Sequence, residues 1–425
     1  MSVYTGTILV LAALLIGGCD AADSIFGDSE FDQLNDTLRV RIESASGGLG
    51  AQVFLLPDPG DLMTVRQLPS NPLTASKVRL GQVLFHETEL AVENLEPEGL
   101  KTYSCASCHH ARAGFQAGIP QGIGDGGVGF GKNGETRRPD PRYDLVNLGV
   151  QAVRSPAVLN LGYQDNLGWT GRYESVEELA LASFPMFRLD VAGIDTVTAY
   201  RALFAEAFEV EPEEAINEER AAQALAAYMR TIVSNETPFQ EWLHGNPLAM
   251  SGKQLEGAIL FFGKAGCVGC HSGPALNSSE FYALGFNDLA GPGAYTEAFT
   301  EDEFSAGRAA VTSKAADQFA FKTPQLYNLI DSPYYGHGSS FNSVRDVIRY
   351  KNEGVAQNPA VPSSQLSALF VPLGLSRDEI DALTAFIETA LYDQNLGRYE
   401  PFAVPSGNCF PNNDPETRVD RRLCY

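Results

Sequence analysis

The stretch C-A-S-C-H at residues 105–109 decides the fold, and C-V-G-C-H at residues 267–271 repeats it in the second half of the chain. In the motif C-x-x-C-H the two thiols add to the vinyl groups of a haem, and the adjacent histidine becomes a ligand of the iron. Random placement of seven cysteines and six histidines would produce roughly 0.002 such motifs in this chain. The sequence therefore predicts two covalently bound c-type haems.

Disulfides or zinc clips are the alternative use of these cysteines. A tetrahedral zinc site needs four ligands near one another, whereas each motif supplies three, and zinc has no need of an adjacent Cys-His pair. Haem attachment is therefore the favoured interpretation. The predicted haem-binding residues are Cys105, Cys108 and His109 in the first motif and Cys267, Cys270 and His271 in the second.

The N-terminal segment is typical of an exported bacterial protein. Residues 7–16 are apolar, and the following Gly17, Gly18 and Cys19 resemble a lipoprotein signal with Cys19 as the lipidated first mature residue. Residues 1–6 contain no Lys or Arg, so a plain cleaved signal and an anchoring helix stay open as alternatives. Because haem is attached to C-x-x-C-H outside the bacterial cytoplasm, we expect a periplasmic protein whose membrane contact is a lipid at Cys19.

Two further cysteines lie in the C-terminal tail. Cys409 and Cys424 flank a segment rich in Pro, Asn and Asp, and an exported location favours a disulfide between them. Two free thiols are the alternative.

Composition agrees with a large soluble protein of two domains plus extensions. The chain has 425 residues, of which 30 are Lys or Arg and 53 are Asp or Glu, giving a formal net charge of −23. This charge disfavours nucleic acid and anionic lipid as partners. It also favours encounter with a basic redox protein, although a charge of this size is ordinary for solubility.

The helix signals repeat around the two motifs. A helix beginning at Ser76 precedes the first motif, and a capping box of Ser251 and Gln254 begins a helix before the second. Residues 114–134 are dense in Gly, and a Pro- and Arg-rich link through Pro141 and an extended run to Arg154 follow, so a long irregular loop is predicted. Further helix starts are predicted at Ser175, Asn217, Ser343 and Ser376. The predicted fold class is mainly α, with two tandem cytochrome c-type haem domains and long irregular loops.

These signals divide the chain into five segments. The alternating stretch 38–42 suggests a strand within the second of them. The segments are a signal peptide at 1–18, an extension at 19–60, an N-terminal cytochrome c domain at 61–237, a C-terminal cytochrome c domain at 238–400 and a tail at 401–425.

Several stretches outside the motifs resemble bacterial di-haem cytochrome c peroxidases, a group that includes MauG-type enzymes. R-S-P-A-V-L-N at 154–160 and K-T-P at 322–324 match, as does P-Y-Y-G-H-G at 333–338. The matching Trp169, with Gly171 and Arg172 after it, implies an indole that relays electrons between the haems. The resemblance covers about residues 75 to 395.

The resemblance implies that the first haem is the peroxide site. Its iron needs an open position for cleavage of the O–O bond. His86 precedes the motif on a helix and His110 adjoins the ligand His109, so neither is well placed to reach the opposite haem face. We expect a five-coordinate or water-bound iron, with an unlocated distal histidine as the alternative.

The second haem lacks the family's methionine ligand, because the five methionines end at Met250. MauG-type enzymes use a tyrosine there, and Tyr350 stands in the corresponding region. A gap-free count places the family's ligand on Lys351, about 100° around the helix from its neighbour. Tyr350 is the predicted ligand of the second iron, with Lys351 or an open position as alternatives.

The family's acid for peroxide cleavage is missing from its aligned place. The matching glutamine and glutamate positions hold Leu179 and Leu189, and the nearest candidates are Asp190 and Arg188. Asp190 is the predicted catalytic acid, with a surface salt bridge as the alternative. Calcium is possible between the domains but is not predicted, because the matching asparagine position holds Arg154.

Taken together, the sequence predicts a di-haem c-type peroxidase. Hydrogen peroxide would react at the first haem, and a small cytochrome or cupredoxin would supply electrons through the second haem and Trp169. One alternative is a MauG-like enzyme that oxidises aromatic side chains of a partner protein. A di-haem electron carrier without peroxidase activity is the other.

Overall fold

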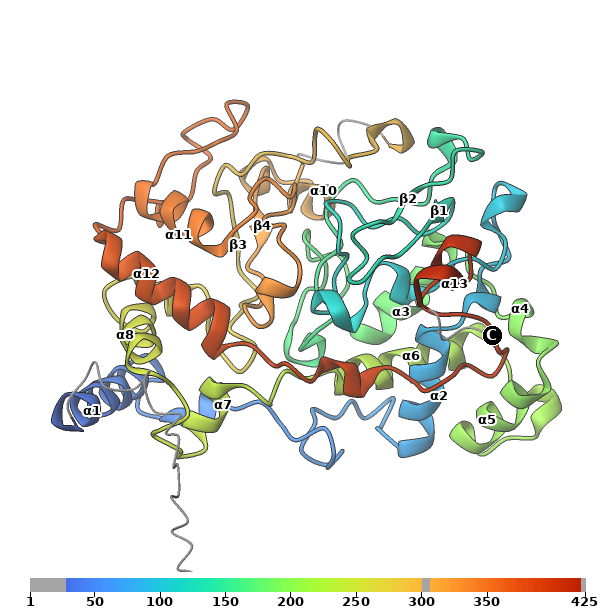
Figure 1. Cartoon of the computed structure of the whole chain (residues 1–425), viewed down its shortest axis with the longest axis horizontal. Helices are drawn as coiled ribbons and strands as arrows, with labels where there is room; N and C mark the ends of the chain where they lie inside the picture. Colours follow the sequence, from blue (N-terminus) through green and yellow to red (C-terminus); the bar gives the residue numbers. More distant parts are fainter. Residues whose placement is uncertain (1–27, 300–305, 422–425) are drawn as a thin grey trace, which may run out of the picture.

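The computed structural model describes residues 28–299 and 306–421, so the predicted lipid site at Cys19 and the tail cysteine Cys424 lie outside the described residues. The structure is mainly helical with long irregular segments, as predicted (Figure 1). No helix of the described residues is both long and apolar enough to span a bilayer. The α-helices are α1 (Asp28–Ala45), α2 (Ala75–Phe85), α3 (Val176–Met186), α4 (Ala192–Asp195), α5 (Thr198–Phe208), α6 (Glu218–Thr231), α7 (Pro238–Leu243), α8 (Gly252–Phe261), α10 (Ala309–Thr312), α11 (Val344–Glu353), α12 (Arg377–Ala385) and α13 (Pro415–Arg421).

The strands are short and pair locally. β1 (Gly127–Val128) is antiparallel to β2 (Arg138–Pro139) within the Gly-rich loop, and β3 (Phe281–Tyr282) is antiparallel to β4 (Phe321–Lys322) after the second motif. The predicted helix starts at Ser175, Asn217, Ser251, Ser343 and Ser376 are confirmed, because each of these side chains accepts a hydrogen bond from the third residue of its helix. Helix α2 is capped by Thr74, two residues before the predicted start.

Two crossing helix pairs organise the two halves of the molecule. α2 packs on α6 in the first half, and α8 packs on α12 in the second. Each pair meets at a glycine. A Cβ atom on Gly81 would lie 1.9 Å from the carbonyl oxygen of Ala224, and one on Gly257 would lie 2.0 Å from that of Ala382. Each of these glycines lies in the helix that precedes a C-x-x-C-H motif in the sequence. A side chain would not fit at either position.

The first half carries additional helices. α3 packs against α6, and α5 packs against α2, whereas α1 and α11 cover the second pair. The Arg230 guanidinium at the end of α6 pairs with Glu177 of α3 at 3.0 Å, with the arginine buried. This ion pair joins the added layer to the crossing pair.

The predicted strand at residues 38–42 is wrong, because this stretch lies within the long helix α1. Leu38 and Ile42 are buried and four residues apart, whereas Val40 between them is 68% exposed. That spacing places the two buried side chains on one helical face. α1 packs against α8 of the second half, and Asn35 accepts a hydrogen bond from Nε1 of Trp242 at 2.6 Å.

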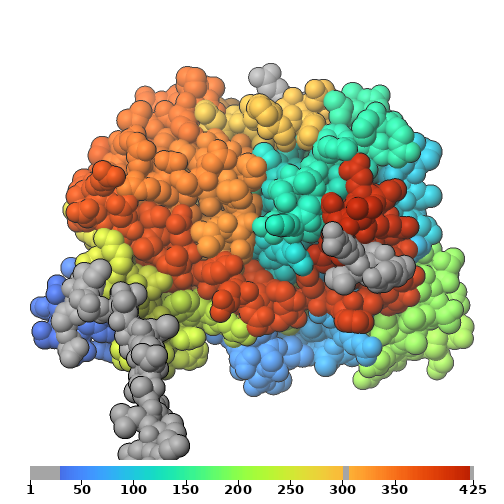
Figure 2. Space-filling model, viewed as in Figure 1, coloured from blue at the N-terminus to red at the C-terminus, as the bar shows by residue number. Residues whose placement is uncertain are grey.

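The C-terminal tail folds back over the first half, where it covers the teal surface of the Gly-rich loop (Figure 2). Asp414 accepts a hydrogen bond from the backbone of Gly129 at 3.0 Å and lies 3.8 Å from the buried Arg137. The Pro411 carbonyl accepts hydrogen bonds from the hydroxyls of Ser104 and Ser107, at 2.8 and 3.2 Å. The tail therefore braces the turn that carries the first C-x-x-C-H motif.

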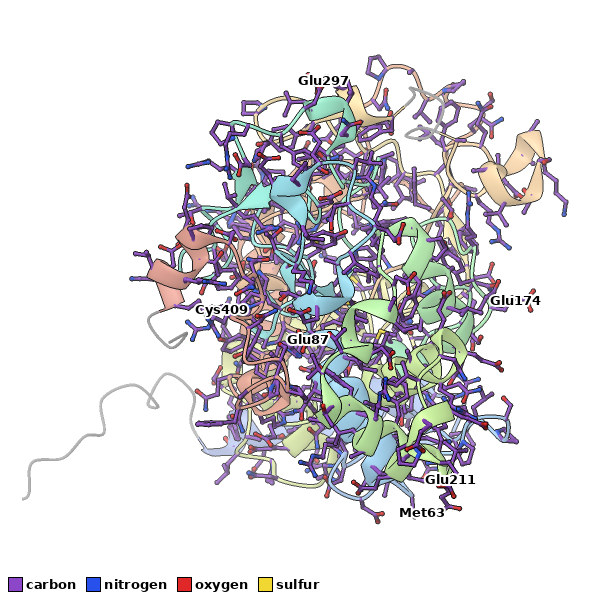
Figure 3. All side chains as sticks on the ribbon, turned by 90° about the vertical axis from the view of Figure 1, so that its right-hand side faces the viewer. Met63, Glu87, Glu174, Glu211, Glu297 and Cys409 are labelled. Carbon is purple, nitrogen blue, oxygen red and sulfur yellow. The ribbon has the colours of Figure 1, made fainter. Side chains whose placement is uncertain are left out.

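A buried carboxylate fixes the tail to the end of the first helix pair. Glu87, labelled with Cys409 in Figure 3, accepts hydrogen bonds from Tyr200 at 2.6 Å and from Ser406 of the tail at 2.8 Å. Burial raises the pKa of the Glu87 carboxyl. Cys409 is disulfide-bonded, and its predicted partner Cys424 lies outside the described residues.

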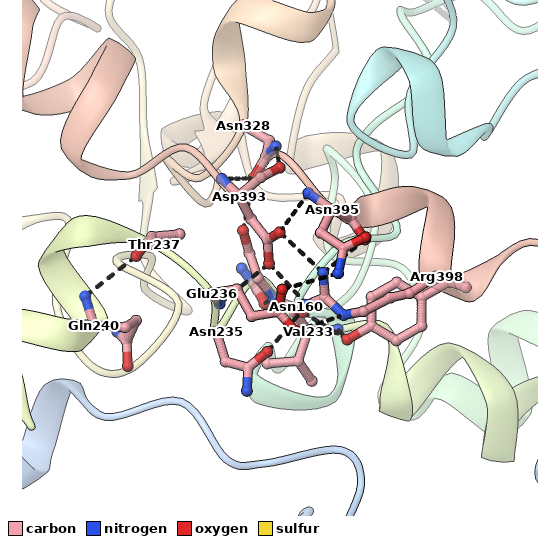
Figure 4. Close-up of polar contacts among 12 residues, drawn as sticks. Asn160, Val233, Asn235, Glu236, Thr237, Gln240, Asn328, Asp393, Asn395 and Arg398 are labelled. Carbon is pink, nitrogen blue, oxygen red and sulfur yellow. Dashed lines mark hydrogen bonds and ion pairs between the residues drawn. The ribbon is translucent and has the colours of Figure 1, made fainter. Parts of the chain in front are cut away.

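A buried polar network joins the two halves (Figure 4). Arg398 donates to both carboxylate oxygens of Asp393, at 2.9 and 2.7 Å, and Asp393 is 1% exposed. The side chain of Asn328 donates to the Asp393 carbonyl at 2.8 Å and accepts from Ser234 at 2.6 Å. Ser234 also donates its backbone N–H to Asn160 of the first half at 2.9 Å. Segments from both halves therefore share one set of hydrogen bonds.

The close helix crossing yields a stability prediction. Gly257→Ala should destabilise the holoprotein by about 2 kcal/mol or more, because the added Cβ would meet the Ala382 carbonyl and Phe386 and force α8 away from α12. Gly397→Ala is the control, since a Cβ there meets nothing within 4 Å. Denaturant unfolding monitored by circular dichroism measures both. Equal stability of the two variants would contradict the account of the crossing.

Candidate functional site

The first motif forms a tight turn that aims its histidine. Residues Cys105–Ser107 make a 3₁₀ turn, and the backbone N–H of His109 donates to the Cys105 carbonyl at 3.1 Å. Nδ1 of His109 lies 3.3 Å from the carbonyl oxygen of Phe115. A carbonyl only accepts, so Nδ1 carries the proton and Nε2 keeps its lone pair.

The second motif repeats this geometry. Residues Cys267–Gly269 make the same turn, and the His271 N–H donates to the Cys267 carbonyl at 2.8 Å. Nδ1 of His271 is 3.0 Å from the Leu276 carbonyl and 3.1 Å from that of Pro324. In both imidazoles Nδ1 is held by a backbone carbonyl, so Nε2 is the nitrogen available to a metal ion. This arrangement is usual for metal-bound histidines.

The side chains of both motifs fit a covalently attached haem. The four motif cysteines form no disulfide and are partly exposed. Burial lowers the pKa of both imidazoles to about 4, so both are neutral at pH 7, the state in which histidine binds a metal. Each motif thus offers two thiols for the vinyl groups and one neutral nitrogen for the iron.

Trp169 lies at the junction of the two halves. Its Nε1 donates to the Arg154 carbonyl at 2.8 Å, and its own carbonyl accepts from the backbone of Lys322 in β4 at 2.9 Å. Its ring is 6.3 Å from the ring of His337, measured between centroids. The tryptophan predicted as the electron relay is therefore attached to segments of both halves.

His337 is a junction residue that sequence reasoning did not single out. It is 2% exposed, its ring stacks on Phe321 at 3.6 Å, and Nε2 lies 3.0 Å from Asp288. Its carbonyl accepts from the backbone of Arg154 at 2.8 Å. His337 belongs to the stretch 333–338, which resembles the family, but the sequence alone does not show that its ring lies beside Trp169.

Tyr350 and Lys351 of α11 have different polar surroundings. The Tyr350 hydroxyl donates to the Leu284 carbonyl at 2.5 Å, accepts from the Gln357 N–H at 3.2 Å, and its ring stacks on Phe286. Lys351 is in electrostatic contact with both cysteines of the second motif and with His271. The lysine is therefore within electrostatic range of the second motif, and its amine also lies 5.8 Å from the centroid of the Phe286 ring.

The other histidines near the first motif are enclosed by apolar groups. Nδ1 of His86 donates to the Gln82 carbonyl at 2.8 Å, and its ring packs against Phe410 of the tail. His110 is 1% exposed and packs on Phe130 at 4.9 Å.

The predicted acid Asp190 lies at the start of α4. Its carboxylate accepts from the Ala192 N–H at 2.8 Å. Arg188 pairs with the buried Asp125 at 2.7 Å, and Leu189 is in the apolar core. Leu179 is partly buried against the same core. The role of Asp190 in catalysis stays a prediction.

Two helix pairs, each with a C-x-x-C-H turn between its two helices in the sequence, are joined through one tryptophan and define a di-haem c-type cytochrome. The family model of di-haem cytochrome c peroxidase matches residues 75–247. The methylamine utilization protein MauG of Methylorubrum extorquens is 32% identical over 75% of this chain and 79% of its own. The chain therefore belongs to the di-haem cytochrome c peroxidase family and carries two haem c groups.

Other relatives agree with this assignment. Cytochrome-c peroxidase IdrP1 of Denitromonas iodatirespirans is 29% identical over 85% of this chain and 95% of its own. Among solved structures, a MauG-like protein associated with microbial copper homeostasis has a TM-score of 0.61 at 23% identity and covers 81% of this chain and 95% of its own. The di-haem peroxidase BthA of Burkholderia thailandensis has a TM-score of 0.56 at 17% identity, with 82% and 91% covered. These two structures share the fold.

Proposed function

We propose that this enzyme reduces hydrogen peroxide to water with electrons from a small redox protein. The observation that carries the proposal is the pair of equivalent, neutral, carbonyl-held imidazoles on either side of the Trp169 junction. Haem iron supplies the redox chemistry: peroxide takes up two electrons and two protons and leaves as two waters. Cytochrome-c peroxidases are among the relatives, which supports this substrate.

The chain's own residues position and connect the two sites. His109 and His271 hold their rings by hydrogen bonds to carbonyls, which fixes each Nε2. Trp169 is fixed at Nε1 by Arg154, so its indole stays at one place between the halves. A half-buried indole held in place by a hydrogen bond is suited to pass an electron from the second site to the first, where peroxide would bind.

A MauG-like oxidation of a partner protein is the second candidate function. The MauG of Methylorubrum extorquens is 32% identical to this chain. This chain also has no methionine after Met250 to serve as a thioether ligand. In this case electrons would come from aromatic side chains of the partner and not from a redox protein.

We also propose that Lys351 supplies the second ligand at the His271 site, with Tyr350 as the alternative. The Tyr350 hydroxyl is already used by the backbone of Leu284 and Gln357, whereas the Lys351 amine is in electrostatic contact with the motif cysteines. In the described part of the chain no hydrogen bond or ion pair holds that amine, which lies 5.8 Å from the centroid of the Phe286 ring. Binding an iron would therefore cost the amine a weak cation–π contact but no hydrogen bond.

Periplasmic location and a lipid anchor at Cys19 belong to the same proposal. They are supported by the apolar N-terminal run and by the extracytoplasmic attachment of haem to C-x-x-C-H. The expected electron donor is a small cytochrome or cupredoxin.

The peroxidase proposal predicts catalytic turnover. Purified protein mixed with hydrogen peroxide and a reduced small cytochrome should oxidise two donor molecules per peroxide, because the reaction needs two electrons. Stopped-flow absorbance of the donor measures this. An absence of donor oxidation, together with spectra that peroxide leaves unchanged, would favour the electron carrier and contradict both enzyme functions. Spectral change without donor turnover would favour the MauG-like function.

The relay role predicts a specific loss in Trp169→Phe. Electron transfer between the sites should slow by tenfold or more while both haems stay attached, because phenylalanine packs similarly but is much harder to oxidise. Trp242→Phe is the control, since Trp242 packs against α1 away from the junction. Transient kinetics after reduction of one haem measures the rate. Equal rates in both variants would count against the relay.

The ligand proposal predicts a difference between neighbouring residues of α11. Lys351→Ala should convert the second ferric iron from low spin to high spin, because it removes the sixth ligand, whereas Tyr350→Phe should leave the spin state unchanged. Lys351→Met should restore low spin and raise the reduction potential, as thioether ligation does. Electron paramagnetic resonance of the diferric protein decides, and the opposite pattern would assign the ligand to Tyr350.

A further inference from the structure

Arg154 is a buried cation without a carboxylate partner. Its residue is 2% exposed, and its Nη2 donates to two neutral groups, the Gln116 amide oxygen and the Ser332 hydroxyl, each at 2.8 Å. Its Nη1 has no hydrogen-bond partner among the described residues. A buried charge left unpaired in this way is costly, so the native protein should supply an anion.

The other buried arginines show how this protein ordinarily treats such a charge. The fully buried Arg137 and Arg230 each have a carboxylate near the guanidinium, Asp414 at 3.8 Å and Glu177 at 3.0 Å. The half-buried Arg188 and Arg398 are paired in the same way, with Asp125 and Asp393, each at 2.7 Å. Arg154 has no carboxylate partner among the described residues, its favourable electrostatic contacts are with the phenols of Tyr334 and Tyr335, and burial lowers its pKa to about 10. Arg154 therefore differs from these arginines because it lacks a partner anion among the described residues. Its place in the fold indicates where such an anion would come from.

That position is the junction between the two motifs. The backbone of Arg154 donates to the His337 carbonyl and accepts from the indole of Trp169, each at 2.8 Å. Gln116, which holds the guanidinium, directly follows Phe115, whose carbonyl holds His109. The guanidinium is also in electrostatic contact with the His109 ring. A second buried polar atom without a partner in the described chain, Nδ1 of His337, lies at the same junction.

We propose that Nη1 of Arg154 binds a propionate carboxylate of the haem attached at Cys105 and Cys108. Haem carries two such carboxylates at its edge, and a charge-assisted hydrogen bond from a guanidinium is the strong way to hold one in a buried place. Arg154 is thus a positioning residue. It places a fixed positive charge beside the first haem and, through the Trp169 indole on its carbonyl, ties the haem edge to the junction tryptophan. This inference rests on the haem groups and does not depend on peroxidase activity.

A crystal structure of the mature holoprotein tests the contact directly. It should place Nη1 of Arg154 within about 3.2 Å of a carboxylate oxygen of the first haem. A guanidinium whose Nη1 binds only water or backbone, with both propionates directed elsewhere, would overturn the proposal. This test needs no variant and is therefore not affected by misfolding.

Redox titration tests the electrostatic consequence. Arg154→Gln should lower the ferrous-to-ferric ratio of the first haem about tenfold at a fixed solution potential, because a nearby positive charge favours the less positive ferrous state. Arg154→Lys keeps the charge and should stay within about threefold of the wild type. Arg308→Gln is the matched control, since the half-buried Arg308 donates to Thr170 and Gly171 on the tryptophan loop. A shift of equal size in Arg308→Gln, or no shift in an Arg154→Gln protein that retains both haems, would refute the proposal.

Discussion

The fixed orientation of two imidazoles is the constraint on which the rest of the structure depends. A carbonyl at 3.3 Å from Nδ1 of His109, and two carbonyls at 3.0 and 3.1 Å from that of His271, leave Nε2 as the free nitrogen in both rings. The turn that carries each histidine follows the first helix of a pair that meets at a glycine. The helix crossing, the turn and the carbonyls together set where an iron can bind, and the irregular loops are long because much of each core is provided by the haem.

The two halves are joined by exchanged ends and a buried junction. α1, at the start of the described chain, packs on the second half, and the C-terminal tail braces the first motif through the carbonyl of Pro411. Between the halves, Trp169 is held by Arg154 on one side and by the backbone of Lys322 on the other. These attachments give the indole one position relative to both motifs. An electron relay requires such a fixed position, because the rate of transfer falls steeply with distance.

The sequence predicted the local parts of this structure well and the long-range parts poorly. Capping residues such as Ser251 and Ser376 determine helix starts through bonds three residues away, so they can be recognised without the fold. The alternation at residues 38–42 was misleading, because the exposed Val40 between two buried residues also fits one face of a helix. Whether residue 350 or residue 351 lies nearer the second motif depends on a rotation of about 100° around α11. The absence of a carboxylate beside Arg154 depends on segments that are far apart in the chain. No local sequence pattern predicts these two features.

The central claim is that the chain binds one haem through each of its two C-x-x-C-H turns. Mass mapping of peptides from the mature protein tests it most directly. We predict two haem-bearing peptides, one containing residues 105–109 and the other residues 267–271. Recovery of either peptide with both thiols unmodified, in protein that is otherwise fully mature, would contradict the account.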